Sequence, residues 1–279
     1  MTAQTKNVPN SLDNREFFRG VLKTIYLIMA EAFEMHKISV TPIGADGSRL
    51  SIPVKIEGLD SEDRQIIYFG KILGGSDIMT ERTFQLFKNI YLQMNSREPL
   101  FDFTHSAKEM AKHQFEGLSK MYDIGIPTAK PFGYYPLVGG LWLFVAEFLD
   151  MGDAVSGKKI KMEQLEEAFQ HLRKMHRKKV FHGDIKPENF IFSDQVYIMD
   201  VGHLLEDAPQ KEKRAYDLAC MIASFLEFGT PEAIVKLARK NYPGRDLKRA
   251  SDYLDLIDKR PDFRLSAVKI EKLIRLLQK

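Results

Sequence analysis

One short polar segment limits what this chain can fold into more than any other stretch of its 279 residues. Residues 182–189 read HGDIKPEN, and a second carboxylate, Asp200, follows Asn189 by eleven residues. Between Asn189 and Asp200, two short apolar runs flank Ser193-Asp194-Gln195, a pattern typical of a tight hairpin. A hairpin at this point predicts that Asp184 and Asp200 lie at strand ends beside one cleft.

The residue types in this segment are those that phosphoryl transfer requires. The reaction needs an acceptor oxygen in line with a γ-phosphate, and cations that neutralise the phosphate oxygens. We expect the Asp184 carboxylate to act on the acceptor hydroxyl and Lys186 to stabilise the transferring phosphate. Asn189 and Asp200 supply oxygen ligands for Mg²⁺. The sequence therefore predicts a catalytic group of Asp184, Lys186 and Asn189, with Asn189 and Asp200 as metal ligands.

The wording HGDIKPEN, followed by DVG at residues 200–202, resembles the protein-kinase-like superfamily. It is most similar to small atypical members: RIO-type kinases, the small kinase of the tRNA threonylcarbamoyl complex, and Kdo/heptose lipopolysaccharide kinases. The resemblance covers about residues 39–228. It implies an α+β, two-lobed fold, with a small antiparallel-sheet N-lobe over residues 38–149 and an α-rich C-lobe over residues 150–279. Residues 1–37 are expected to form an N-terminal helical extension.

The resemblance also implies ATP and Mg²⁺ as the nucleotide and the metal ion. The preferred acceptor is a Ser or Thr hydroxyl on a protein, as in RIO-type kinases. A sugar hydroxyl of a glycolipid or lipopolysaccharide is the nearest rival acceptor. A nucleotide-binding pseudokinase that acts as a scaffold is the alternative of a different class.

Composition excludes several other classes of protein. At 44% hydrophobic residues the chain can bury the core of one kinase-sized unit. Its 41 basic and 38 acidic residues, for a net charge of +3, indicate a mixed surface and no dedicated nucleic-acid binding. Cys220 is the single cysteine, which excludes an intramolecular disulfide and a cysteine-rich metal site. A reducing, cytoplasmic setting is therefore expected.

The sequence pattern of the N-terminal part predicts neither a secretion signal nor a membrane span. The first fourteen residues lack an apolar core, and Arg19, Lys23 and Glu31 interrupt the apolar segment 17–33. The apolar spacing in this segment predicts a helix with one buried stripe. We expect that stripe to pack on the N-lobe; docking to a membrane surface or to a partner is the alternative.

Residues 38–43 and 50–56 are expected to form a hairpin around the turn Gly44-Ala45-Asp46-Gly47-Ser48. Such a turn is a weak signal when it stands alone, because most merely reverse the chain. Upstream of the 182–189 segment it becomes a candidate phosphate-covering loop, since small residues let backbone N–H groups approach phosphate oxygens. Gly44, Gly47 and Ser48 are the predicted nucleotide-binding residues here.

A third strand is expected over residues 65–73, and it carries Lys71 among apolar neighbours. By resemblance, a lysine on this strand holds the α- and β-phosphates of the nucleotide. Lys55 is the rival, but it lies only eight residues after Gly47, which is too few for a strand, a turn and half a second strand. Lys88 is a weaker rival, because its flanks read as helix.

The helix expected at residues 106–122 should present the glutamate that pairs with Lys71 in related kinases. Its apolar face instead carries Gln114, while Glu109 and Glu116 fall away from that face. Two alternatives stay open: Gln114 bonds Lys71 as a neutral substitute, or a helix shift brings in one of the glutamates.

The remaining elements complete the expected kinase-like fold. Residues 141–149 read as a buried strand that enters the interlobe hinge, where resemblance places backbone groups near Glu147 and Leu149 against adenine. Amphipathic helices are expected at residues 162–175, from 215 onward, and at 231–241, 246–258 and 266–277. Asp217 matches the family's aspartate that anchors the catalytic loop, whereas His176 and His203 read as ordinary polar residues. Only sixteen residues separate Asp200 from Asp217, so no activation segment of the usual length is present.

Overall fold

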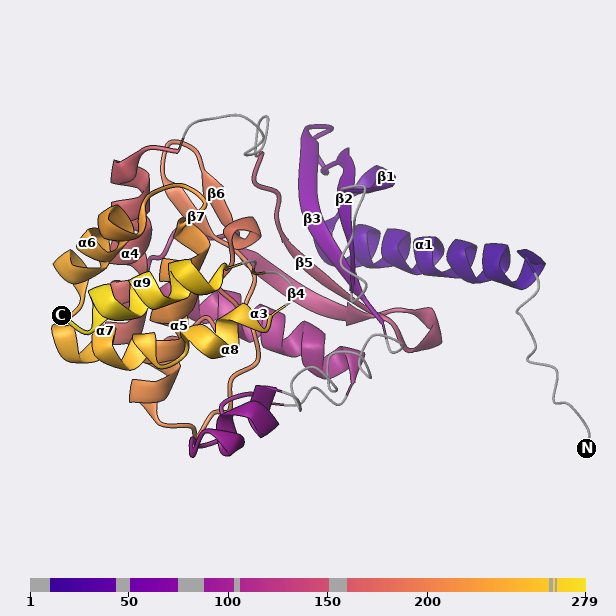
Figure 1. Ribbon diagram of the computed structural model, residues 1–279. Coiled ribbons are helices and arrows are strands. Elements are labelled where there is room, and N and C mark those ends of the chain that lie inside the picture. Colours follow the sequence, from indigo (N-terminus) through magenta and orange to yellow (C-terminus); the bar gives the residue numbers. More distant parts are fainter. Residues whose placement is uncertain are drawn as a thin grey trace, which may run out of the picture. The chain divides into compact units, whose positions relative to one another are not determined.

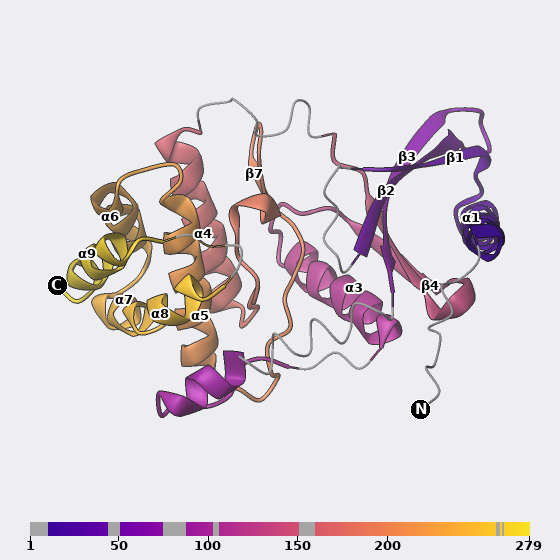
Figure 2. The same cartoon turned by 45° about the vertical axis from the view of Figure 1, so that its right-hand side comes forward.

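The computed structural model describes most of the chain and divides it into two compact units (Figures 1 and 2). The described residues are 11–43, 51–74, 88–102, 106–150, 160–260, 263 and 265–279. The first unit comprises residues 1–78, 106–112 and 132–148, and the second comprises 79–105, 113–131 and 149–279. An antiparallel sheet dominates the first unit and helices dominate the second, so the predicted α+β class is confirmed. The lobe boundaries expected after residues 37 and 149 stay a prediction.

The sheet of the first unit has five strands in the part of the chain described, in the order β1-β2-β3-β5-β4. The strands are β1 (His36–Pro42), β2 (Ser51–Leu59), β3 (Gln65–Leu73), β4 (Pro131–Pro136) and β5 (Trp142–Glu147). The third strand has the predicted bounds, and Lys71 lies on it between Pro53 of β2 and Phe144 of β5. Lys71 is therefore on the central strand of the sheet.

Helix α1 (Ser11–Phe33) covers one face of this sheet. Val21, Ile25 and Met29 recur at a helical spacing of four and are almost fully buried against Val54 and Leu143 of the sheet. The short helix η1 (Val138–Gly140) also contacts α1. The predicted packing of the N-terminal helix on the sheet is thus confirmed. Among the described helices, none is long and apolar enough to cross a membrane.

The second unit is built largely from helices. Its elements, with α3 beginning in the first unit, are α3 (Ala107–Asp123), α4 (Met162–Arg177), η2 (Pro187–Asn189), β6 (Phe190–Phe192), β7 (Val196–Ile198), α5 (Gln210–Phe225), α6 (Pro231–Asn241), α7 (Gly244–Ser251), α8 (Leu254–Asp258) and α9 (Ala267–Leu277). Residues 88–94 are also helical. Strands β6 and β7 pair antiparallel, which confirms the predicted hairpin.

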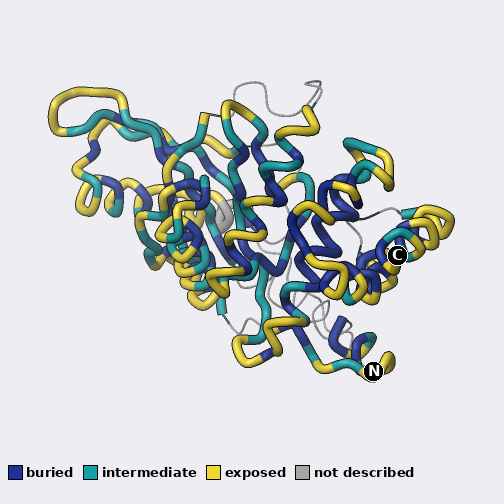
Figure 3. Tube along the Cα trace, turned by 90° about the vertical axis from the view of Figure 1, so that its left-hand side faces the viewer, coloured by how far each residue is buried: buried dark blue, intermediate teal, exposed yellow. Residues whose placement is uncertain are grey.

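Helix α5 is the centre of the second unit. Every residue from Ala215 to Phe225 is buried, because α4, α6, α7 and α8 all pack against this helix. The surrounding helices are amphipathic, and Figure 3 shows buried and exposed positions alternating along such stretches of the trace.

The single helix expected over residues 246–258 is in fact two helices, α7 and α8. The Ser251 hydroxyl donates to the Lys248 carbonyl over 2.7 Å. A carbonyl in the last turn of α7 thus accepts from a side chain and not only from a backbone amide of a continuing helix. The turn that follows buries Tyr253, whose hydroxyl donates to Glu212 over 2.8 Å. This tertiary contact outweighs the continuous helical pattern.

Candidate active site

The 182–189 segment lies in the second unit, between α4 and β6, and Asp217 fixes its backbone. One Asp217 carboxylate oxygen accepts from the amide of His182 and the other from the amide of Gly183, each over 2.8 Å. Asp217 is fully buried on α5. Bonds from backbone amides to a buried carboxylate are among the stronger hydrogen bonds in proteins. The predicted anchoring role of Asp217 is therefore confirmed.

His176, at the end of α4, belongs to the same network. Its Nε2 atom lies 3.2 Å from Asp217 Oδ2, and its Nδ1 atom lies 2.9 Å from the Tyr242 hydroxyl. Burial lowers the pKa of His176, which keeps the imidazole neutral near pH 7. The sequence reading of His176 as an ordinary polar residue missed this contact, because Tyr242 and Asp217 are distant in the chain.

Two glycines let the 182–189 segment and the 200–202 segment pack backbone to backbone. The Gly202 amide donates to the His182 carbonyl over 2.7 Å, and a Cβ atom on Gly202 would lie only 2.7 Å from the Gly183 backbone and from Asp184 Cβ. Gly183 has a φ of 79°, a conformation that a side chain disfavours. Asp200 also has a positive φ, 61°, and its Oδ1 accepts from the Val201 amide. This left-handed backbone sets the direction of the Asp200 side chain.

The Asp184 carboxylate is held between two cations. Its Oδ2 lies 3.1 Å from Lys186 Nζ, and its Oδ1 accepts from Arg260 Nη2 over 2.7 Å. Burial raises the pKa of Asp184, but the charges of Arg260, Lys186 and Lys88 outweigh burial and hold that pKa well below its usual range. Asp184 is therefore an ionised carboxylate near neutral pH.

Asn189 connects the backbone of Asp184 to the backbone just before Asp200 through two hydrogen bonds. Its Nδ2 donates to the Asp184 carbonyl over 2.7 Å, while its own carbonyl accepts from the Met199 amide over 2.8 Å. The side-chain nitrogen is committed to the loop, so the amide oxygen is the atom of Asn189 that suits a cation.

The donor set fits Mg²⁺. Asp200 provides a carboxylate on the segment beside Asn189, and Mg²⁺ binds such hard oxygens together with substrate phosphates. Within the described ranges no group of three or more His, Cys, Asp and Glu side chains could hold a metal ion without a substrate. Asn189 and Asp200 would therefore bind the ion jointly with phosphate oxygens.

The predicted nucleotide-binding residues are distributed over both units. Gly44, Gly47 and Ser48 lie outside the described residues. Lys71 and Glu147, the last residue of β5, belong to the first unit, whereas Gln114 and Leu149 belong to the second. The pairing of Lys71 with Gln114 and the contacts of Glu147 and Leu149 with adenine accordingly stay predictions.

The predicted orientation of α3 is confirmed, because Gln114 is buried while Glu109 and Glu116 are exposed. The same helix contacts the 200–202 segment through its small residue Gly117, where an added Cβ would lie 2.6 Å from Val201. His113 on α3 lies 2.9 Å from the Gly202 carbonyl oxygen. Helix α3 thus positions the segment that carries Asp200.

Lys55, the rival of Lys71, has two contacts of its own. Its Nζ lies 2.8 Å from Glu57 on the same strand and 5.4 Å from the centre of the Phe148 ring. These contacts occupy the Lys55 ammonium group within the first unit.

Sequence reasoning missed Arg260 as a cation near Asp184, and it weighed Lys88 only as a rival of Lys71 for the nucleotide. Arg260 follows α8, and its side chain is 3% exposed. Lys88 is 8% exposed, with Nζ 3.8 Å from the centre of the Phe101 ring. A single basic residue beside a short helix usually lies in solvent, so no local signal in the sequence distinguishes these two.

No model of a known protein family matches the sequence, and no curated protein sequence matches it. The structure is similar to that of a candidate fructosamine-3-kinase from Haemophilus somnus 129PT, at 12% identity and a TM-score of 0.49, with 94% of this chain and 98% of that chain covered. It is also similar to the kinase PK-1 of the Cydia pomonella granulovirus, at 13% identity and a TM-score of 0.46, with 92% of each chain covered.

Proposed function

We propose that this protein is a kinase-like enzyme that transfers the γ-phosphoryl group of ATP to an alcohol. The observation that carries the proposal is the Asp184 carboxylate, which lies between Lys186 and Arg260 in a loop whose backbone is fixed by Asp217. A carboxylate that is ionised, oriented and fixed at its backbone is the group that phosphoryl transfer needs beside the acceptor hydroxyl.

Asp184 orients the acceptor hydroxyl and receives its proton late in the transfer. Its depressed pKa makes it a weak base, so alignment of the hydroxyl is its main contribution. Lys186, whose Nζ lies 3.1 Å from Asp184, stabilises negative charge on the transferring group. Both side chains are on one short stretch of backbone, two residues apart in the chain.

Asn189 and Asp200 hold Mg²⁺ in this proposal. When bound, the ion neutralises charge on the phosphate oxygens. The protein contributes the left-handed backbone at Asp200 and the hydrogen bond from Asn189 to the Asp184 carbonyl, which fix the two ligand side chains in direction.

The sheet of the first unit supports nucleotide binding. Lys71 lies on its central strand, and β5 beside it ends at Glu147, where the proposed hinge begins. We assign Lys71 to the α- and β-phosphates and the backbone near Glu147 and Leu149 to adenine.

The preferred acceptor is a Ser or Thr hydroxyl on a protein. A sugar hydroxyl of a glycolipid or lipopolysaccharide is the rival, and a nucleotide-binding scaffold without transfer is the third alternative. These three differ in where phosphate from ATP arrives.

The test is incubation of the purified protein with γ-labelled ATP and Mg²⁺, alone and with a cell extract that is then separated into protein and lipid fractions. We expect label on Ser or Thr of proteins with the wild type and none with Asp184→Asn. Label in the glycolipid fraction would identify a sugar kinase instead. Nucleotide binding with no transfer to either fraction or to water would overturn the proposal and identify a scaffold.

A further inference from the structure

Arg260 is a buried cation in contact with Asp184, the central carboxylate of the proposed reaction. It follows α8 in the chain, 76 residues after Asp184, and its guanidinium donates to Asp184 Oδ1 over 2.7 Å. Its side chain is 3% exposed. Burial of a guanidinium is unfavourable unless the charge is paired and hydrogen-bonded, so this contact is central to the local structure.

Three groups hold the guanidinium plane in one orientation. Nη1 donates to the Tyr216 hydroxyl over 2.8 Å and lies 3.6 Å from the Cys220 sulfur. The guanidinium also lies 4.9 Å from the centre of the Phe263 ring. Tyr216 and Cys220 are four residues apart on α5 and therefore share one helix face.

The same turn of α5 fixes the backbone of the 182–189 segment through Asp217. Asp217 binds the amides of His182 and Gly183, and its neighbour Tyr216 binds Arg260. One helical turn thus controls both the backbone of the loop and the side chain of Asp184.

The two partners of Arg260 on this turn are themselves buried. Tyr216 and Cys220 are fully excluded from solvent, each with an exposed fraction of 0%. Burial raises the pKa of Cys220 to about 12, so its sulfur stays a thiol and is no nucleophile at neutral pH.

We propose that Arg260 is a positioning residue for phosphoryl transfer: it holds Asp184 through Oδ1, so that Oδ2, beside Lys186, is the oxygen that meets the acceptor hydroxyl. This inference rests on the proposed function. A free aspartate side chain has several rotamers, and the Arg260 contact selects one of them before the acceptor binds.

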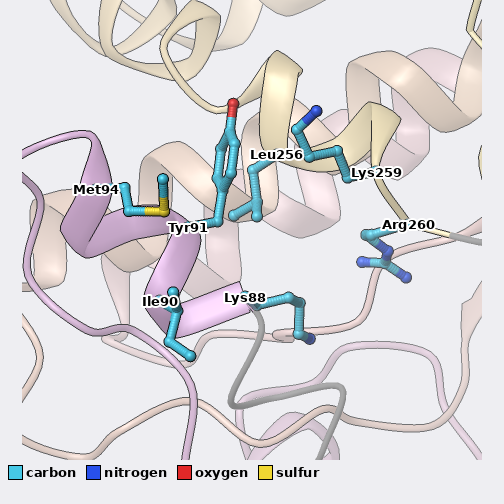
Figure 4. Close-up of a pocket in the computed structure, with 7 residues that line it drawn as sticks. All are labelled: Lys88, Ile90, Tyr91, Met94, Leu256, Lys259 and Arg260. Atoms are coloured by element: carbon cyan, nitrogen blue, oxygen red, sulfur yellow. The ribbon is translucent and has the colours of Figure 1, made fainter.

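Arg260 also forms part of the wall of a pocket of about 250 Å³ within the second unit (Figure 4). Lys88 and Arg260 lie on one side of this pocket and Met94 lies on the other. Truncation of Arg260 would open this wall, so a small cation in solution could enter and replace the lost guanidinium. The pocket therefore makes chemical rescue a practical test.

The experiment compares Arg260→Ala, Arg260→Lys and the control Arg214→Ala, which removes a different ion pair of the second unit, the one between Arg214 and Asp246. Hydrolysis of Mg²⁺-ATP, with water as the acceptor, gives kcat and KM, and calorimetry gives the affinity for ADP. We expect Arg260→Ala to lower kcat roughly 10- to 100-fold, because misplacement of a reacting group costs that much. KM for ATP and the affinity for ADP should change by less than about twofold, since Arg260 does not bind the nucleotide.

Rescue distinguishes positioning from a merely structural role. Guanidinium chloride at a non-denaturing concentration should raise kcat of Arg260→Ala several-fold and leave wild type and Arg214→Ala unchanged. Arg260→Lys should have an intermediate kcat, because lysine keeps the charge but loses the planar fork. Should Arg260→Ala lose its cooperative unfolding transition, Tyr216→Phe takes its place: it removes one partner of Arg260, keeps the charge, and should lower kcat by a smaller factor.

A folded Arg260→Ala protein with wild-type kcat would overturn this inference and leave the proposed function intact. A loss of kcat with an equal loss of ADP affinity, and without rescue, would also overturn it in favour of a structural role. Absence of any ATP turnover in the wild type would instead overturn the proposed function, and the role of Arg260 with it.

Discussion

The amide nitrogen of Gly202 donates to the carbonyl oxygen of His182 over 2.7 Å, so the two motifs of the proposed active site touch through their backbones. At this distance there is no room for a side chain between the two segments. A Cβ atom on Gly202 would lie 2.7 Å from Asp184 Cβ, well inside van der Waals contact. The relative position of Asp184 and Asp200 therefore depends on a glycine at residue 202.

Gly202→Ala should destabilise the protein and reduce ATP turnover. The added methyl group has to displace backbone and not the end of a flexible side chain, so we expect a loss of about 1–3 kcal/mol in the free energy of unfolding. Denaturant unfolding and a turnover assay measure the two effects. Gly244→Ala is the matched control, since nothing lies within 4 Å of its added Cβ. Equal stability of the two variants would contradict the close approach.

Asp184→Asn should abolish phosphoryl transfer and leave ATP binding largely intact. The substitution keeps the size of the side chain but removes the charge that Lys186 and Arg260 hold, and effects of this type are worth roughly 10²–10⁴ in rate. Turnover and calorimetric ATP affinity are the two measurements. Asp194→Asn, in the exposed turn of the β6–β7 hairpin, is the control and should be near neutral. Undiminished turnover in Asp184→Asn would rule out the assignment.

Asp200→Asn should weaken nucleotide binding that depends on Mg²⁺. Asparagine tolerates the left-handed backbone at this position and retains an oxygen for the Val201 amide, so the change removes mainly charge. A thermal-shift titration with ATP, with and without Mg²⁺, should show a smaller Mg²⁺-dependent gain than in wild type. An equal gain in both proteins would show that Asp200 is no metal ligand.

Lys71→Ala should raise KM for ATP far more than Lys55→Ala. Lys71 lies on the central strand β3 beside β5, and Lys55 lies on β2, where its Nζ is 2.8 Å from Glu57. The Lys55–Glu57 ion pair is half-exposed and contributes little stability, about 0–1 kcal/mol, so Lys55→Ala should stay folded. Kinetics of both variants under identical conditions decide the assignment. A larger defect in Lys55→Ala would move the nucleotide lysine to β2.

Activity should not require phosphorylation between Asp200 and Asp217. Helix α5 begins at Gln210, which leaves little chain to be rearranged, and the interval's single hydroxyl, on Tyr216, is fully buried. Mass spectrometry after incubation with ATP, then phosphatase treatment and a repeat assay, should show phosphates elsewhere and little change in turnover. Loss of activity that tracks a phosphate on Tyr216 would refute this expectation.

Much of the local structure could be predicted because the sequence pattern reports burial directly. The apolar spacing of α4, the alternation along β2 and β3, and the buried face of α3 that includes Gln114 are all properties of neighbouring residues. The role of Asp217 was predictable as well, since the resemblance matches it to the aspartate at the start of a helix that anchors the catalytic loop.

Contacts between distant segments could not be predicted in this way. Arg260 binds Asp184 across 76 residues of the chain, and His176 binds Asp217 across 41. Contacts at such separations produce no periodic pattern of apolar and polar residues in the sequence. The break between α7 and α8 likewise depends on the burial of Tyr253 against Glu212.

The sequence by itself determined which groups are available to this protein: two carboxylates, a lysine and an amide, in the order that the proposed phosphoryl transfer would use. Tertiary structure decided how the central carboxylate is held, because a buried guanidinium finds its partner only when α5 and the residue after α8 are packed together. The physical reason is the free-energy cost of an unpaired buried charge. This cost requires that a buried cation has a partner in the folded structure, but the sequence does not show which arginine is buried.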